Sequence, residues 1–244
     1  MLDATSAVMV HTAFELGGIA VGIRLYANAL RRAGGGSIAQ GAAFAVVLGC
    51  VLGAIVGSKA AVWLQQPDAF VAGLRAPLML WNGQSIVGAL IGGWLGVEVA
   101  KRLAGVRKST GDAFVFPLIV GIAIGRIGCF LAGLHDDTYG VPSDLPWAMD
   151  FGDGIRRHPT QLYDIAFVLA FGALLFRWRH ELAQVPGLRF KWFLAGYLMW
   201  RVVIDFLKPV PAAYPLGLSG LQWLALVFLA GYLPVVVAQT RRIA

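Results

Sequence analysis

The chain has 244 residues, of which 58% are hydrophobic and only 14% charged, and its formal net charge is +7. A soluble domain normally has about 25% charged residues, so this composition excludes a water-soluble globular protein and predicts an integral membrane protein. The positive charge does not indicate a nucleic-acid partner, because the basic residues do not gather in one soluble segment with interleaved aromatic residues.

Seven apolar stretches are each long enough to cross a bilayer as a helix, which takes about 20 residues. They lie at about 6–30, 38–64, 82–104, 112–134, 159–178, 190–207 and 218–238. We therefore expect an all-α fold, a bundle of seven transmembrane helices that forms a single membrane domain over residues 1–244.

The basic residues predict the orientation of this bundle. Most of them follow the odd-numbered stretches: Arg31, Arg32, Lys101, Arg102, Arg107, Lys108, Arg177, Arg179, Arg189, Lys191, Arg241 and Arg242. Because cytoplasmic loops carry the excess of lysine and arginine, the N-terminus is predicted outside and the C-terminus in the cytoplasm, in a multi-pass protein of the cytoplasmic (inner) membrane. The longest connection, at about 135–158, then lies outside the cell, and a loop of this length usually has a function.

Glycine recurs at every fourth position in three of these stretches. The positions are Gly49, Gly53 and Gly57, then Gly88, Gly92 and Gly96, then Gly121 and Gly125. Such spacing puts small residues on one helix face, where it allows two backbones to approach closely. We expect these glycines to pack helices together.

Two arginines lie within apolar stretches. Arg126 stands in GIAIGRIGCFLAGL, and Arg201 is followed by Asp205 and Lys208 at one-turn intervals. A charge at the centre of a transmembrane helix costs about 2.5–3.5 kcal/mol on insertion scales, so each guanidinium needs a partner or a ligand. Two bidentate donors suit an anion with several oxygens, above all a phosphate. The alternative for Arg201 and Asp205 is a buried ion pair that fixes helix packing.

The densest polar segment runs from the outside loop into the fifth stretch, as HDDTYGVPSDLPWAMDFGDGIRRHPTQLYD. Pro159 suits the first position of a helix, after which Gln161, Tyr163 and Asp164 enter the membrane within two turns. For Tyr163, anchoring at the membrane interface is an alternative to a role in a binding site. Cys129 lies on the same helical face as Arg126, and a buried free thiol is its simplest interpretation.

These residues resemble the prolipoprotein diacylglyceryl transferase family. GRIGCF, the Tyr139–Gly140 pair, DLPWAM, RHPTQLYD and the later Arg201–Asp205–Lys208 series are similar to that family's GRxGNFxNxE, YG and RHPSQLYE patterns, from about Gln84 onward. The resemblance implies transfer of the diacylglyceryl group of phosphatidylglycerol, or of a similar anionic phospholipid, to the cysteine thiol of a lipoprotein precursor. Glycerol phosphate would be released, and no cofactor would be needed.

The resemblance also implies roles for individual residues. Arg126 and Arg201 would stabilise the phosphate during transfer, and Asp205 would orient Arg201. The other residues that we expect to bind substrate are Cys129, Tyr139, Gly140, His158, Gln161, Tyr163, His11 and Glu15. No metal site is predicted, because the four histidines are widely spaced in the sequence.

The chain departs from the family pattern at the positions that matter for proton transfer. The signature asparagine is Cys129, the Asn-x-Glu that follows is replaced by Ala132 and Leu134, and Val87 stands where the family has a histidine. Substitutes for the missing base are His135, Asp136 or Asp137 in the outside loop, and His11 or Glu15 in the first stretch. Of these, His135 and Asp136 are the catalytic candidates.

Three functions are therefore open at this stage. The first is the family activity, and the second is a related transferase that uses the same lipid with a different acceptor. The third is a membrane protein that binds or transports lipid without chemistry. No internal repeat of the kind common in secondary transporters is evident in the sequence.

Overall fold

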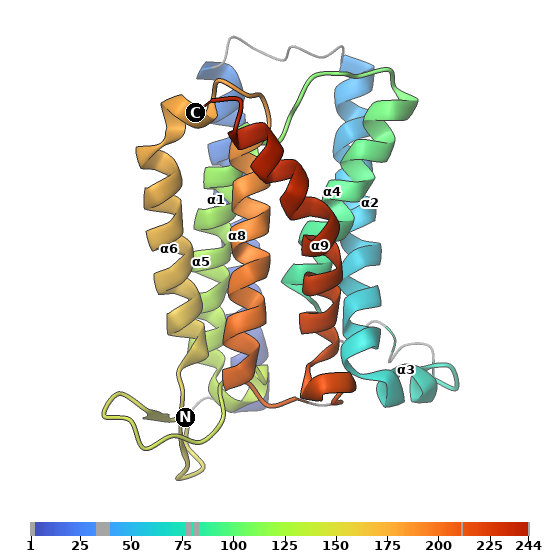
Figure 1. Cartoon of the computed structure of the whole chain (residues 1–244). Helices are drawn as coiled ribbons and strands as arrows, with labels where there is room; N and C mark the ends of the chain where they lie inside the picture. The colour runs from blue at the N-terminus through green and yellow to red at the C-terminus, as the bar shows by residue number, and fades with distance from the viewer. Residues whose placement is uncertain (1–2, 33–39, 77–79, 81–82, 211, 244) are drawn as a thin grey trace. The chain divides into compact units, whose positions relative to one another are not determined.

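The computed structural model describes residues 3–32, 40–76, 80, 83–210 and 212–243, and its regular structure is almost entirely helical (Figure 1). The α-helices are α1 (Ala4–Arg32), α2 (Gln40–Gln65), α3 (Pro67–Gly73), α4 (Ile86–Leu103), α5 (Val115–Ala132), α6 (Thr160–Arg177), α7 (Arg179–Leu182), α8 (Leu188–Ile204) and α9 (Gly220–Thr240). Short 3₁₀ turns are η2 (Asp112–Phe114), η3 (Gly133–Asp136), η4 (Asp205–Leu207) and η5 (Pro215–Gly217). Two strands, β1 (Met149–Asp150) and β2 (Arg156–Arg157), pair antiparallel.

One long helix lies in each of the seven apolar stretches, which confirms the all-α prediction. Among the described residues, five helices are long and apolar enough to cross a membrane, namely α1, α2, α5, α6 and α9. The other two fall short for separate reasons: α8 has only 17 residues, and α4 carries Glu98, Lys101 and Arg102. The seven crossings and the orientation of the chain ends therefore stay predictions.

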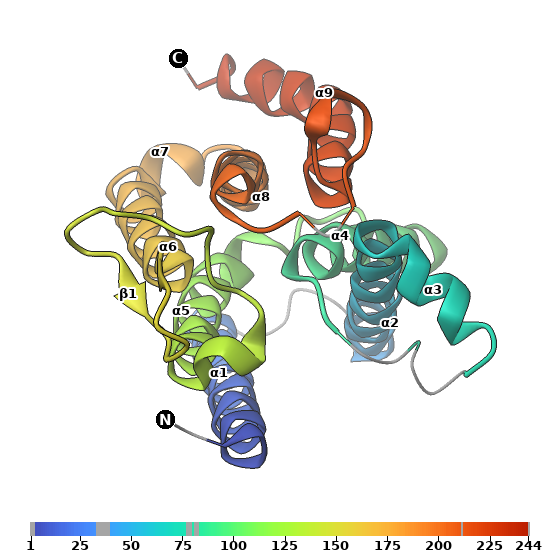
Figure 2. The same cartoon turned by 90° about the horizontal axis from the view of Figure 1, so that it is seen from below.

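Contacts divide the chain into two compact units. The first unit comprises Met1–Arg32, Thr110–Pro209 and Val235–Ala244, and the second comprises Ala33–Ser109 and Val210–Pro234. In the first unit α1 packs on α5, α5 on α6 and α6 on α8, and these neighbours are visible along the helix axes in Figure 2. Its core consists of apolar side chains from these helices, including Val115, Val168, Phe193, Leu194 and Leu198.

In the second unit α2 and α4 pack against each other through their glycines. A Cβ atom added to Gly49 would lie 2.6 Å from the carbonyl oxygen of Gly96, and one added to Gly53 would overlap the carbonyl oxygen of Gly92. This confirms the close approach that the spacing predicts. In the first unit Gly18 and Gly121 meet in the same way, at 2.8 Å, but Gly125 has open space around it. Of these two glycines of α5, only Gly121 approaches another backbone, so the prediction is wrong for Gly125.

We expect Gly49→Ala to destabilise the protein by about 1–3 kcal/mol, because the added methyl group meets backbone and the helices must separate. The matched control is Gly231→Ala in α9, where a Cβ would meet nothing within 4 Å. There alanine should leave stability unchanged or raise it by up to about 1 kcal/mol, through helix propensity. Thermal unfolding in detergent measures both variants, and equal midpoints would contradict tight packing at Gly49.

Candidate active site

Three helices of the first unit bring Arg126, Asp164 and Arg201 together. Arg126 Nε from α5 lies 3.0 Å from Asp164 Oδ2 of α6, and Arg201 Nη1 from α8 lies 4.0 Å from the same oxygen. The Asp164 side chain is only 1% exposed. The two guanidiniums that the sequence singles out therefore converge on one buried carboxylate.

Two further residues hold this centre in place. Arg201 Nη2 donates a hydrogen bond to Asp205 Oδ1 one turn further on, so Asp205 has the position predicted for orienting Arg201. Trp200 Nε1 donates to Asp164 Oδ1 at 2.8 Å. Because each oxygen of Asp164 has its own donors, the carboxylate is fixed between α5, α6 and α8.

Lys208 adds a third basic group to the centre. It follows η4, its Nζ lies 3.5 Å from Asp164 Oδ2, and its side chain is 12% exposed. Burial and, to a smaller extent, repulsion from Arg201 lower the pKa of Lys208 to about 7, although Asp164 opposes the shift. Three basic side chains therefore neighbour two carboxylates, Asp164 and Asp205. The unbalanced positive charge favours the binding of an added anion.

Several polar atoms in this region are buried without hydrogen-bond partners. Among the described residues, they include Arg201 Nε and Nη1 and both side-chain amide atoms of Gln161. Buried polar atoms are normally hydrogen-bonded, so unsatisfied donors beside a positive centre mark a place where ligand oxygens fit. The separation of 4.0 Å between Arg201 Nη1 and Asp164 is an ionic contact rather than a hydrogen bond.

The loop between η3 and α6 contains three of the other predicted binding residues, Tyr139, Gly140 and His158. Gly140 N donates to His158 O at 2.9 Å, and a Cβ on Gly140 would lie 2.6 Å from His158 Cβ, so this position needs glycine. Tyr163 accepts a hydrogen bond from Trp147 Nε1 at 2.7 Å, and its hydroxyl lies 3.3 Å from His158 Nδ1. Through these contacts His158 and Tyr163 hold the loop against the start of α6.

Charged residues stiffen the same loop. Arg157 pairs with Asp153 at 2.7 Å and lies over the ring of Tyr139, 5.0 Å from its centroid. The hydrogen bond from Arg157 lowers the pKa of Asp153 to about 2. Arg156 donates to the carbonyl groups of Leu145, Pro146 and Ala148, so it closes the loop on itself. Tyr139 thus belongs to the loop framework.

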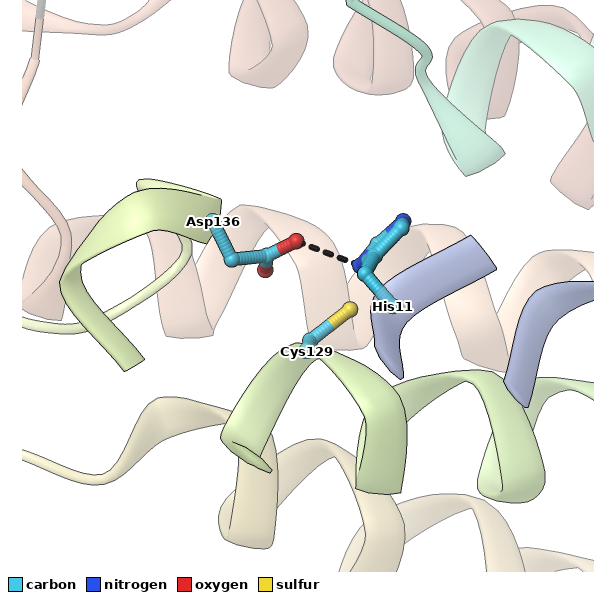
Figure 3. A group of neighbouring side chains, drawn as sticks. All are labelled: His11, Cys129 and Asp136. Atoms are coloured by element: carbon cyan, nitrogen blue, oxygen red, sulfur yellow. Dashed lines mark ion pairs between the residues drawn. The ribbon is translucent and has the colours of Figure 1, made fainter. Parts of the chain in front are cut away.

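A second cluster lies beside Arg126 and joins residues that are far apart in the sequence. His11 of α1, Cys129 of α5 and Asp136 of η3 each offer one donor atom, and these atoms lie within 4.8 Å of one another (Figure 3). His11 Nδ1 is 2.7 Å from Asp136 Oδ1, and His11 Nε2 is 3.9 Å from Glu15 Oε2. Arg126 Nη1 donates to Cys129 Sγ at 3.9 Å, which connects the cluster to the centre formed by Arg126, Asp164 and Arg201.

The two histidine candidates for the base occupy different surroundings. His11 belongs to the cluster with Cys129 and Asp136, whereas His135 in η3 interacts electrostatically with Asp3 before the start of α1. Of the candidates in the outside loop, Asp136 is the one that reaches the cluster. The spacing of the four histidines does not predict this grouping, because its three residues are far apart in the sequence and meet only through helix packing.

Asp164 and Lys208 are the important residues that the sequence-based site leaves out. Asp164 is the last residue of the RHPTQLYD motif. From the sequence alone it is only a polar residue near the start of a helix. The signal that identifies it is its place one turn after Thr160 on the first turns of α6, where a carboxylate inside the membrane needs cationic partners.

Comparison with known proteins agrees with these motifs. A family profile described as "Prolipoprotein diacylglyceryl transferase" matches residues 4–238. The chain belongs to the prolipoprotein diacylglyceryl transferase family. The resemblance noted in the sequence is thereby confirmed.

Individual members of the prolipoprotein diacylglyceryl transferase family match over most of their length. A protein of Bordetella avium is 36% identical over 208 residues, which cover 82% of this chain and 76% of the relative. One from Azoarcus sp. is 38% identical over 191 residues, 71% of this chain and 69% of the relative. One from Cupriavidus necator is 35% identical over 214 residues, with 80% and 73% covered. All three are named phosphatidylglycerol–prolipoprotein diacylglyceryl transferase.

Proposed function

We propose that this protein is a transferase of lipoprotein biosynthesis that moves the diacylglyceryl group of phosphatidylglycerol to the cysteine thiol of a prolipoprotein. Glycerol phosphate is the second product. One observation carries the proposal: Arg126, Arg201 and Lys208 surround Asp164 in a buried centre with unused hydrogen-bond donors. The names of the relatives supply the lipid and the acceptor.

The arginine centre suits the leaving group of this reaction. The acceptor thiolate attacks the glyceryl carbon that bears the phosphate ester, a carbon–sulfur bond forms, and the carbon–oxygen bond breaks. The electron pair leaves with the phosphate oxygen, so negative charge grows there. Buried, fixed guanidinium donors stabilise such charge most effectively in the transition state, which supports a catalytic role for Arg126 and Arg201.

We infer that the chain forms a single membrane domain over residues 1–244, which crosses the cytoplasmic (inner) membrane seven times with its N-terminus outside. The basic residues that follow the odd-numbered helices support this orientation. The loop at about 135–158 and the His11 cluster then lie near the outer surface. There a prolipoprotein presents its cysteine, while phosphatidylglycerol enters from the bilayer.

A related transferase with another acceptor is the second candidate function. The observation that favours it is the loss of family side chains, because Cys129, Leu134 and the buried Val87 stand at positions of asparagine, glutamate and histidine. Valine takes no proton, so acceptor activation differs in this chain from the family pattern. A protein that binds or transports lipid without transfer would use the same group of basic residues. Experiment distinguishes it from a transferase.

The test is incubation of the purified protein with headgroup-labelled phosphatidylglycerol and a peptide that contains a lipobox cysteine. We expect labelled glycerol phosphate to be released only when the peptide is present, together with a thioether-linked product. A peptide with serine in place of the cysteine is the control. Release with a different acceptor supports the second candidate, and binding of the lipid without release contradicts both transferase functions.

A further inference from the structure

We propose that His11, Cys129 and Asp136 bind a zinc ion that holds the acceptor thiol as a thiolate beside Arg126. This inference rests on the proposed function, because it explains how the acceptor is activated. The three residues come from α1, α5 and η3, all within the first unit, and their side chains point toward one another (Figure 3).

The geometry is close to that of a zinc site with three protein ligands. The three donor atoms lie within 4.8 Å of one another. Zinc–ligand bonds of about 2.0–2.3 Å put neighbouring ligands of a tetrahedral site roughly 3.3–3.8 Å apart. The distance of 2.7 Å between His11 Nδ1 and Asp136 Oδ1 is shorter than this, and the limit of 4.8 Å for the group is longer, so the ligand side chains have to move by about 1 Å to admit the ion.

The donor set favours zinc over other common divalent ions. Thiolate and imidazole are ligands of zinc, whereas magnesium and calcium prefer oxygen ligands alone. Three protein ligands also leave a fourth position free, as in catalytic zinc sites. Cys129 is only 7% exposed and the Asp136 side chain 7%, but the His11 side chain is 34% exposed. The open position can therefore be reached past His11.

The surroundings of the cluster also resemble those of a metal site. His11 Nδ1 is buried and has no hydrogen-bond partner among the described residues, and its contact with Asp136 Oδ1 at 2.7 Å is an ion pair. Glu15 lies 3.9 Å from the other ring nitrogen of His11, so a small side-chain movement would let this carboxylate orient a zinc-bound histidine. Thr138 donates its hydroxyl to Asp136 Oδ2. Asp136 thus has a neighbour that fixes its direction, and His11 has a carboxylate close by.

Zinc would supply the step that Val87 cannot perform. A thiol that coordinates zinc loses its proton outright, here to solvent on the exposed side of His11. The sulfur then forms its bond to the glyceryl carbon, and the oxygen of the departing glycerol phosphate takes the electron pair beside Arg126. Cys129 stays a ligand and is not consumed, and the oxidation state of the ion does not change.

Cobalt(II) is the probe that tests metal binding without relying on activity. The detergent-purified protein is treated with a chelator, dialysed and titrated with Co²⁺. We expect one equivalent to bind with the visible bands of tetrahedral cobalt and a thiolate-to-cobalt charge-transfer band in the near ultraviolet. Cys129→Ser should abolish the charge-transfer band, whereas Cys50→Ser, the matched control at the other free cysteine, should retain it.

Two histidine variants make the test independent of any folding defect in the cysteine variant. His11→Gln should abolish stoichiometric binding, and His180→Gln in α7 should bind cobalt as the wild type does. Glu15→Gln should weaken binding by about 10–100-fold, as expected for a residue that orients a ligand. Absence of cobalt binding in the folded wild type, or an unchanged charge-transfer band in Cys129→Ser, would overturn the proposal.

The role of the ion is tested with the lipobox peptide. Its cysteine form should intensify the charge-transfer band of the cobalt protein, and its serine form should not. Chelator-treated protein should lose transfer and regain it on addition of Zn²⁺. Full transfer after complete metal removal would overturn the zinc proposal and leave the transferase function intact. Cobalt binding with no transfer under any condition would overturn the transferase function instead.

Discussion

Replacing Arg126 with lysine is expected to reduce diacylglyceryl transfer by about 10²–10³-fold, the usual effect of removing one donor that stabilises transition-state charge. Lysine keeps the positive charge opposite Asp164, so the fold is expected to survive. It cannot present the planar pair of donors that a phosphate accepts. Arg201→Lys is expected to behave in the same way, because its Nε and Nη1 atoms are the unused donors.

The measurement is steady-state release of labelled glycerol phosphate as a function of phosphatidylglycerol concentration. A lower kcat with little change in KM would indicate that the guanidinium acts mainly in the transition state. The matched control is Arg24→Lys, an exposed arginine of α1, which should turn over at the wild-type rate. Wild-type kcat in both Arg126→Lys and Arg201→Lys would refute the assignment of the two arginines to the phosphate.

Much of the fold follows from the sequence because a bilayer leaves the chain few choices. Backbone groups in lipid must be satisfied internally, so each long apolar stretch becomes a helix. The glycine spacing in α2 and α4 predicts that each helix packs closely on another, since only facing small residues permit the observed approach of Gly49 to Gly96. The arginines could also be selected in advance, because a buried guanidinium is too costly to lack a partner or a ligand.

The partners of those arginines could not be predicted in the same way. Asp164 lies on α6, and its contact with Arg126 depends on how α5, α6 and α8 turn about their axes, which helical periodicity alone does not fix. The His11–Cys129–Asp136 cluster has the same origin, because it depends on the packing of α1 against the C-terminal end of α5. The short helix α7 and the β1–β2 hairpin arise from local turn contacts, for which the sequence has no strong pattern.

Asp164→Asn is expected to destabilise the protein by about 3–5 kcal/mol, the usual cost of breaking a buried ion pair from one side. The substitution keeps the shape of the side chain but leaves Arg126, Arg201 and Lys208 with Asp205 as their remaining neighbouring carboxylate. Because the Asp164 side chain is 1% exposed, water cannot screen the resulting repulsion. Asp144→Asn, at an exposed carboxylate of the loop between η3 and α6, is the control and should unfold as the wild type does.

An anion that binds the same centre should restore part of the lost stability, because it replaces the missing negative charge. We expect phosphatidylglycerol to raise the thermal midpoint of Asp164→Asn more than that of the wild type, since a ligand stabilises a protein in proportion to its preference for the folded state. Phosphatidylcholine, which has no net charge, should stabilise both proteins equally. If the two lipids have the same effect on the variant, the positive centre does not bind the anionic headgroup. Its arginines then serve only to hold α5, α6 and α8 together.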